Sequence, residues 1–228
     1  MTPAQLTGKS ADHITCIEDL RCELHLGVKA AFLDMRAAAQ AQGIDLVAAS
    51  AYRTFERQLL IWNAKYTGER PVYDAAGVAL DMRSLDPGAR IEAIVRWSAV
   101  PGSSRHHWGT DLDLIDRNAL PKGYQVQLIP AEFAAQGPFE RLNDWLLRHA
   151  EGYGFFKPYC GIHSGVAPEP WHWSYADIAE AARAELTLEI LQDALEDSAI
   201  LGMDALRLRL RDLHAHFVMN IDPPRWLA

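Results

Sequence analysis

Residues 103–115 bring together two kinds of side chain that bind metal ions. His106 and Asp113 stand seven positions apart with Gly109 between them, and apolar residues alternate with polar ones around the aspartate. Such alternation is typical of a β-strand, so a loop that enters a strand can direct both side chains to one point. The spacing predicts that His106 and Asp113 share a metal ion.

Residues 169–172, Glu-Pro-Trp-His, supply a further nitrogen ligand and a further carboxylate. Catalytic zinc commonly takes three protein ligands, keeps its fourth position for water, and needs a nearby base that accepts a proton from that water. The predicted zinc ligands are His106, Asp113 and His172. The predicted base is Glu169, and the proline that follows it disfavours a helix, so we expect extended backbone there.

The two fragments together resemble a known family. The pattern Ser-x-His-x-x-Gly-x-x-x-Asp from Ser104 to Asp113, followed by Glu-x-x-His, is similar to that of the VanY-type D-alanyl-D-alanine carboxypeptidases and their LD-carboxypeptidase relatives. The similarity covers roughly residues 46–175, and two separated fragments in the same order are more specific than one motif. It implies an α+β protein of the Hedgehog/DD-peptidase fold, with a central, mostly antiparallel sheet, flanking helices and a bound Zn²⁺.

The resemblance also implies a set of substrate-binding residues. The segment Ser-x-Tyr-Arg ends at Arg53, and a glutamine, Gln58, follows it. In the family, residues at these positions and the serine of the zinc motif, here Ser104, bind the substrate. Arg53 would hold the C-terminal carboxylate of the substrate or the developing oxyanion. The alternative reading is that Arg53 pairs with a surface carboxylate, that Gln58 is solvated and that Ser104 is an ordinary loop serine.

Asp111 departs from the pattern of many carboxypeptidases of this type, which have a small apolar residue there. Because side chains alternate along a strand, Asp111 and Asp113 are expected on the same face, where Asp111 can accept a hydrogen bond from a ligand histidine. The murein endopeptidases have an acid at the like position. We expect His107 to be structural and regard His163 as a weaker candidate for the cleft.

The composition bounds the range of partners. The chain has 228 residues, of which 49% are hydrophobic, and carries 22 Lys plus Arg against 30 Asp plus Glu. A net charge of −8 disfavours a nucleic acid or an anionic membrane as partner. The three cysteines lack metal-site spacing, and neither a signal peptide nor a membrane span is recognisable, so we expect reduced thiols and a cytoplasmic protein. An export signal outside this sequence would make it periplasmic.

Periodicity predicts the elements that position these residues. One domain, residues 1–228, is expected, with an N-terminal helix at about 17–42, a peptidase core at about 44–175 and a largely helical C-terminal extension at 176–228. Within these parts we expect a strand at 44–52, a long loop at 67–90 that borders the cleft, and helices at 55–65, 91–100, 130–151, 176–195 and 203–215. A break in the segment 130–151 is expected at the pair Gly137-Pro138. The C-terminal extension could pack on the core or form a homodimer surface.

Together these features predict a zinc metallopeptidase that removes a terminal D-alanine from peptidoglycan stem peptides. The expected cytoplasmic location favours LD-carboxypeptidase action on tetrapeptide muropeptides in cell-wall recycling. Alternatives are DD-carboxypeptidase action on pentapeptides, a murein endopeptidase, or a zinc-containing binding module without catalysis. Glu169 distinguishes the enzymes from the binding module, since a structural zinc site needs no base.

Overall fold

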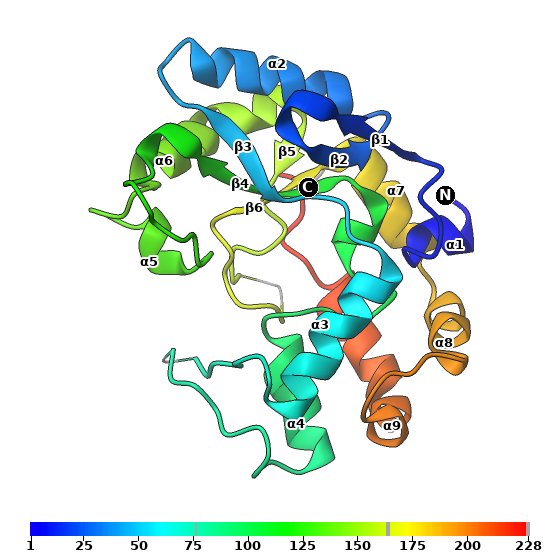
Figure 1. Ribbon diagram of the computed structural model, residues 1–228. Helices are drawn as coiled ribbons and strands as arrows, with labels where there is room; N and C mark the ends of the chain where they lie inside the picture. Colours follow the sequence, from blue (N-terminus) through cyan, green and yellow to red (C-terminus); the bar gives the residue numbers. More distant parts are fainter. Residues whose placement is uncertain (76, 163–164, 227–228) are drawn as a thin grey trace.

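An antiparallel sheet with strand order β3-β4-β6-β5 forms the centre of the molecule (Figure 1). The computed structural model describes residues 1–75, 77–162 and 165–226. A separate hairpin pairs β1 with β2. The strands are β1 (Ile14–Ile17), β2 (Cys22–His25), β3 (Leu46–Ser50), β4 (Asp111–Asp116), β5 (Phe155–Phe156) and β6 (His172–Tyr175).

Helices cover the sheet and continue beyond it. The α-helices are α1 (Pro3–Leu6), α2 (Lys29–Gln40), α3 (Phe55–Thr67), α4 (Pro87–Val95), α5 (Pro130–Phe133), α6 (Glu140–His149), α7 (Ala176–Glu185), α8 (Leu188–Glu196) and α9 (Met203–Leu213). Short 3-10 helices are η1 (Glu18–Leu20), η2 (Arg105–Trp108), η3 (Arg117–Ala119) and η4 (Ala150–Tyr153), and η5 (His214–Met219) is a π-helix. None of the described helices is long and apolar enough to cross a membrane.

The two larger apolar clusters of the described residues involve different sets of helices. The first packs α2 and α6 against the sheet and includes Phe32, Leu46 and Trp145. The second joins α3, α4, α8 and α9 and includes Trp62 and Leu210. Figure 1 shows these four helices grouped at one end of the molecule, away from α2 and α6. The C-terminal extension therefore completes a second core, the first of the two roles expected for it, while a homodimer surface stays a prediction.

The predicted N-terminal helix at 17–42 is wrong in its first half. Residues 14–25 form the β1-β2 hairpin instead, with Arg21 in the left-handed conformation at φ 49°. In β2, Cys22 and Leu24 are buried while Glu23 is exposed, which is the period of two of a half-buried strand. The four-residue spacing of Leu20 and Leu24 fits a helix and a strand equally well, so the two could not be separated. The helix itself starts at Lys29.

Two other predicted helices have different boundaries in the structure, because N-cap residues determine where their helices begin. The predicted helix at 176–195 is two helices, because Thr187 interrupts it and its hydroxyl accepts a hydrogen bond from the Ile190 amide at 3.2 Å. The predicted helix at 91–100 begins earlier, at Pro87, because Asp86 caps it. The expected break in the segment 130–151 is confirmed, since α5 ends at Phe133 and α6 begins at Glu140. The predicted bounds of the peptidase core, 44–175, stay a prediction.

Candidate metal centre

Strand pairing places Asp113 and His172 side by side. Asp113 lies on β4, which is buried along its whole length between β3 and β6. In the antiparallel register Asp113 is directly opposite His172 on β6 and opposite Ser50 on β3. Directly opposite residues of antiparallel strands bring their side chains close together on one face. Two residues that are far apart in sequence therefore meet by register alone.

The short helix η2 supplies His106. It ends at Gly109, whose φ of 68° lies in the left-handed region, and the chain then turns into β4. The Arg53 amide donates to the carbonyl of His106 at 3.1 Å, which holds η2 against the chain that leaves β3. Nδ1 of His106 lies 2.8 Å from the carbonyl oxygen of Ala51. This contact orients the ring so that Nε2 faces Asp113.

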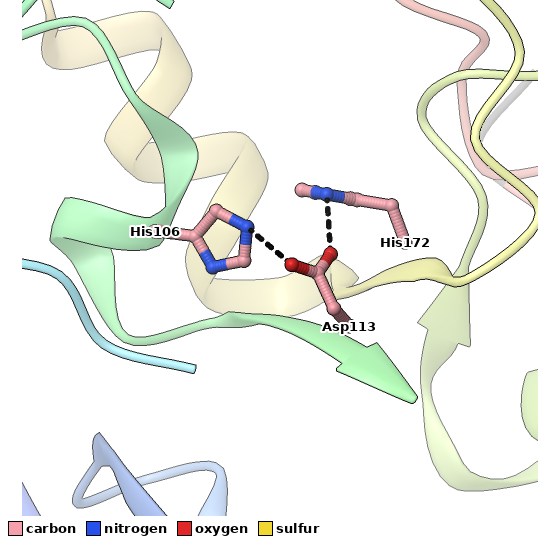
Figure 2. Close-up of side chains that lie close together, drawn as sticks. All are labelled: His106, Asp113 and His172. Carbon is pink, nitrogen blue, oxygen red and sulfur yellow. Dashed lines mark ion pairs between the residues drawn. The ribbon is translucent and has the colours of Figure 1, made fainter. Parts of the chain in front are cut away.

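The three predicted ligands converge, as Figure 2 shows. Nε2 of His106 lies 3.5 Å from Oδ2 of Asp113, and Nδ1 of His172 lies 3.3 Å from Oδ1. One ligand atom of each residue lies within 4.8 Å of the others, as a shared metal ion requires. Oδ1 of Asp113 is buried and makes no hydrogen bond. Such a buried polar atom needs a partner, and two histidines with a carboxylate are a donor set that zinc accepts.

The charges at this point also favour a cation. Burial alone would raise the pKa of Asp113, but the neighbouring His106 and His172 hold it well below its usual range. Burial likewise opposes a charge on His172, yet its contacts with Asp111, Asp113 and Glu169 raise its pKa well above the ordinary value. Acidic groups therefore stabilise positive charge at this buried site.

Glu169 lies beside the ligands but on a turn. The predicted extended backbone from 169 to 172 is wrong, since the His172 amide donates to the Glu169 carbonyl at 3.1 Å and β6 begins only at His172. Residue Pro170 occupies the second position of this turn, which proline favours. Oε2 of Glu169 lies 3.4 Å from Nδ1 of His172. The turn keeps the predicted base close to the predicted metal.

Behind His172 lies a buried network that Asp111 organises. Nε2 of His172 lies 2.8 Å from Oδ1 of Asp111, and Nε of Arg105 donates to the same oxygen at 2.8 Å. Arg105 also donates to the Ser174 hydroxyl at 2.7 Å, and Ser174 lies opposite Asp111 in the sheet. The expected role of Asp111 as an acceptor for a ligand histidine thus has the contact it needs. Arg105 neutralises its charge and was not foreseen.

Arg53 is held at the edge of the site by neutral acceptors. Its guanidinium donates to Oε1 of Gln58 at 2.8 Å and to Oγ of Ser50 at 3.0 Å. Gln58 is fully buried and donates in turn to the Ala99 carbonyl at 2.7 Å. The alternative of a surface ion pair for Arg53 and a solvated Gln58 is therefore wrong. Gln58 positions Arg53, and direct contact of Gln58 with substrate stays a prediction.

A cavity of about 730 Å³ joins these residues. Arg53, Ser104 and Glu169 line it with the three candidate ligands, and the Ser104 hydroxyl makes no hydrogen bond within the described chain. Arg70 and Tyr73 come from the long loop, as predicted. Further lining residues that sequence reasoning missed are Lys65, Arg105, Tyr159, Leu213 and Phe217. The last two come from the C-terminal extension, which therefore forms part of the wall.

The sequence also made predictions for two other histidines, His107 and His163. His107 is structural, as expected, because its Nδ1 lies 2.6 Å from the Arg53 carbonyl and its Nε2 accepts from the Gly102 amide at 3.1 Å. Burial lowers the pKa of His107 to about 3, so the ring is neutral. His163, the weaker candidate, lies outside the described residues.

Comparison with known proteins identifies the family. The model of the family described as VanY, D-alanyl-D-alanine carboxypeptidase, matches residues 21–178, well over half of the chain. The chain belongs to the VanY family. It is thus a peptidase of a zinc peptidase family with the Hedgehog/DD-peptidase fold, and the predicted α+β fold class is confirmed. An uncharacterized protein of Haemophilus influenzae is 35% identical over 122 residues, which are 53% of this chain and 93% of that protein.

Solved structures of VanY proteins have the same fold. VanYB in complex with D-alanine-D-alanine superposes with a TM-score of 0.53 and 21% identity, over 85% of this chain and 87% of that one. The vancomycin resistance D,D-pentapeptidase VanY, in complex with Zn(II), gives a TM-score of 0.52 and 22% identity, over 86% and 92%. These VanY relatives bind a dipeptide and a zinc ion, and this family member has a group of residues that can hold a metal.

Proposed function

We propose that this VanY-family member is a zinc-dependent carboxypeptidase that removes the terminal D-alanine from peptidoglycan stem peptides. One observation carries the proposal: two histidines and an aspartate meet beside a glutamate and an arginine in a single cavity. The zinc ligands would be His106, Asp113 and His172. When bound, zinc increases the acidity of water and polarises the carbonyl group of the bond to be cut.

Glu169 is the proposed general base and acid. Its carboxylate would accept a proton from the attacking water and deliver it to the nitrogen of the leaving D-alanine. The turn that joins Glu169 to His172 places Oε2 of Glu169 3.4 Å from Nδ1 of His172, so the base lies next to a proposed ligand. A binding module without catalysis would need no carboxylate here, which favours the enzyme.

Arg53 is the proposed clamp for the C-terminal carboxylate of the substrate. Its partners Gln58 and Ser50 fix the guanidinium without neutralising it, so its charge remains available to an anion in the cavity. The Ser104 hydroxyl would add a hydrogen bond. An endopeptidase has no terminal carboxylate to bind, and this arrangement therefore supports a carboxypeptidase over a murein endopeptidase.

Within this activity we propose LD-carboxypeptidase action on tetrapeptide muropeptides during cell-wall recycling in the cytoplasm. The DD reaction on pentapeptides is the closest alternative, because one of the VanY structures above is described as a D,D-pentapeptidase. In the LD reaction the residue before the cut bond is a diamino acid, which is larger than D-alanine. A cavity of about 730 Å³ has room for such a residue.

Mass spectrometry of muropeptides tests the proposal. Purified tripeptide, tetrapeptide and pentapeptide muropeptides are incubated with the zinc-loaded protein, with and without chelator. Loss of one alanine from the tetrapeptide alone is the expected result, and chelator should abolish it. Cleavage of the pentapeptide alone would select the DD reaction, and cleavage of a cross-link would select the endopeptidase.

The matched control is Glu169→Gln, which removes the base and none of the three ligands. We expect this variant to bind zinc as the wild type does and to lose turnover by at least about 100-fold, the usual contribution of general acid–base catalysis. Full activity of Glu169→Gln would exclude the proposed mechanism.

A further inference from the structure

Lys65 is a buried cation in the wall of the cavity. It lies on α3, seven residues after Gln58 and thus on the same face of the helix, and its exposed fraction is 9%. The side chain makes no hydrogen bond or ion pair within the described residues. Three charged groups influence the pKa of Lys65 electrostatically: the carboxylate of Glu169 raises it, and the cations Arg70 and Arg53 lower it. Lys65 therefore has no hydrogen-bonding or ion-pair partner among the described residues.

The neighbouring cations leave this part of the cavity with excess positive charge. Arg53 is held by neutral oxygens, and Arg70 lines the cavity from the exposed loop. Of the acids in reach, Asp113 faces the metal site and Glu169 is the proposed base. Neither is free to serve as a permanent partner for Lys65. Among the described residues no other acid is available, so a ligand with a negatively charged group would supply the missing partner.

The free-energy cost of burying an unpaired charge supports the same conclusion. A buried ammonium group without a partner is expensive, and proteins usually pair such a group or replace it. Burial lowers the pKa of Lys65 to about 8, but this still leaves the amine mostly protonated at neutral pH. The cavity opens to solvent, so a dissolved anion can reach the amine. A lysine kept at this position is therefore best explained by a ligand that carries negative charge.

We propose that Lys65, together with Arg70, binds a second carboxylate of the substrate. The preferred substrates would then be peptides with a side-chain carboxylate close to the cut bond, in addition to the C-terminal carboxylate that Arg53 binds. The inference rests on the proposed function and deepens it by naming the substrate class. In the LD reaction the diamino acid immediately precedes the bond that is hydrolysed, whereas in the DD reaction a D-alanine stands between them. A diamino acid with a second carboxylate therefore brings that carboxylate closer to the hydrolysed bond in the LD reaction.

The test compares two tetrapeptides that differ in one charge. Both end in meso-diaminopimelyl-D-alanine, and the side-chain carboxylate of the diamino diacid is either free or amidated. With zinc-loaded wild type we expect kcat/KM to be roughly 10-fold higher for the free acid, the scale of one charge-assisted hydrogen bond. Lys65→Met should reduce this ratio to about one, and Lys65→Arg should restore part of it. The control Arg57→Met removes an exposed cation of the same helix and should keep the wild-type ratio.

The remaining outcomes each decide one specific claim. A wild-type ratio near one, or an unchanged ratio in Lys65→Met, contradicts the second carboxylate site. An equal loss for both peptides would mean that Lys65 binds the terminal carboxylate instead. If neither peptide is hydrolysed, the proposed function fails. Calorimetric binding of the two peptides to the same zinc-loaded proteins then tests the carboxylate site independently. Equal affinities would exclude the site, and tighter binding of the free acid that depends on Lys65 would support it.

Discussion

Nε2 of His172 lies 2.8 Å from Oδ1 of Asp111, so only Nδ1 of this ring faces Asp113. Such an outer contact fixes the tautomer and orientation of a metal-binding histidine, and its loss typically weakens metal affinity 10- to 100-fold. We therefore predict that Asp111→Asn binds zinc roughly 10-fold more weakly than the wild type. Competition with a chelating dye measures this affinity.

A control for Asp111→Asn must distinguish a direct effect on zinc affinity from a general loss of stability. Asp45→Asn removes another largely buried carboxylate, one that precedes β3 and pairs with Arg36 of α2 at 2.7 Å and with Arg117 of η3 at 2.6 Å. It should lower stability without changing zinc affinity. Equal losses of affinity in both variants would show that Asp111 acts only through the fold.

Gly109 is predicted to be required because of what lies against it. A Cβ atom there would come within 2.5 Å of Ile14 Cδ1 and 2.7 Å of the His25 backbone nitrogen, and φ is 68°. Gly123 has a similar φ of 80°, but a Cβ there would meet nothing within 4 Å. Both alanine variants strain the backbone by about 1 kcal/mol, and only Gly109→Ala also displaces the β1-β2 hairpin. Thermal unfolding should show a clearly larger loss for Gly109→Ala, and equal losses would refute the steric explanation.

Gln58 is predicted to act on catalysis through Arg53. Gln58→Glu would place a carboxylate against the guanidinium and neutralise the charge that the substrate needs, since Oε1 already lies 2.8 Å from it. KM should rise by roughly 10-fold or more, the scale of a charge-assisted contact, while zinc content stays unchanged. Gln58→Met, which removes the hydrogen bond and adds no charge, should have the smaller effect on KM. Steady-state kinetics that rank the two variants in the opposite order would contradict this role.

His107 predicts how stability depends on pH. Its pKa is about 3 in the folded protein, below the ordinary value of 6.5, so the stability due to its neutral ring is complete above pH 6.5 and is lost as the pH falls from 6.5 toward 3. Between pH 6.5 and 5 this loss amounts to about 2 kcal/mol. Denaturant unfolding in the presence of chelator measures it without interference from the metal.

His107→Gln is the control for this pH dependence, because an amide can replace both hydrogen bonds of the ring but does not titrate. The variant should lose about 2 kcal/mol less than the wild type over the same interval. An identical pH dependence in both proteins would mean that His107 is not held neutral in the folded state.

The group of candidate metal ligands was predictable because each motif is local in sequence, whereas some of its surroundings depend on tertiary contacts. His106 and Asp113 share one motif, and Glu169 and His172 share another, so residue type and spacing sufficed. The pairing of Asp113 with His172 follows from strand register. Lys65 could not be recognised, because a lysine on a helix is usually solvated, and only the tertiary structure shows that it is buried in the wall of the cavity.

Errors in the fold arose where one pattern fits two structures. The spacing of Leu20 and Leu24 is compatible with a helix and with a strand, and only the left-handed Arg21 and the burial of Cys22 decide for a hairpin. Thr187 is a recognisable cap in the sequence, but the apolar positions continue through it with helical spacing. Pro170 is compatible with an extended chain, but proline equally favours the second position of a turn, which is where it lies.

Elemental analysis of the purified protein tests the central claim most directly. Inductively coupled plasma mass spectrometry should find about one zinc per chain in the wild type and in Glu169→Gln, and far less in Asp113→Ala and His172→Ala of confirmed fold. Absence of a bound metal in the zinc-treated wild type, or full zinc content in both ligand variants, would contradict the account.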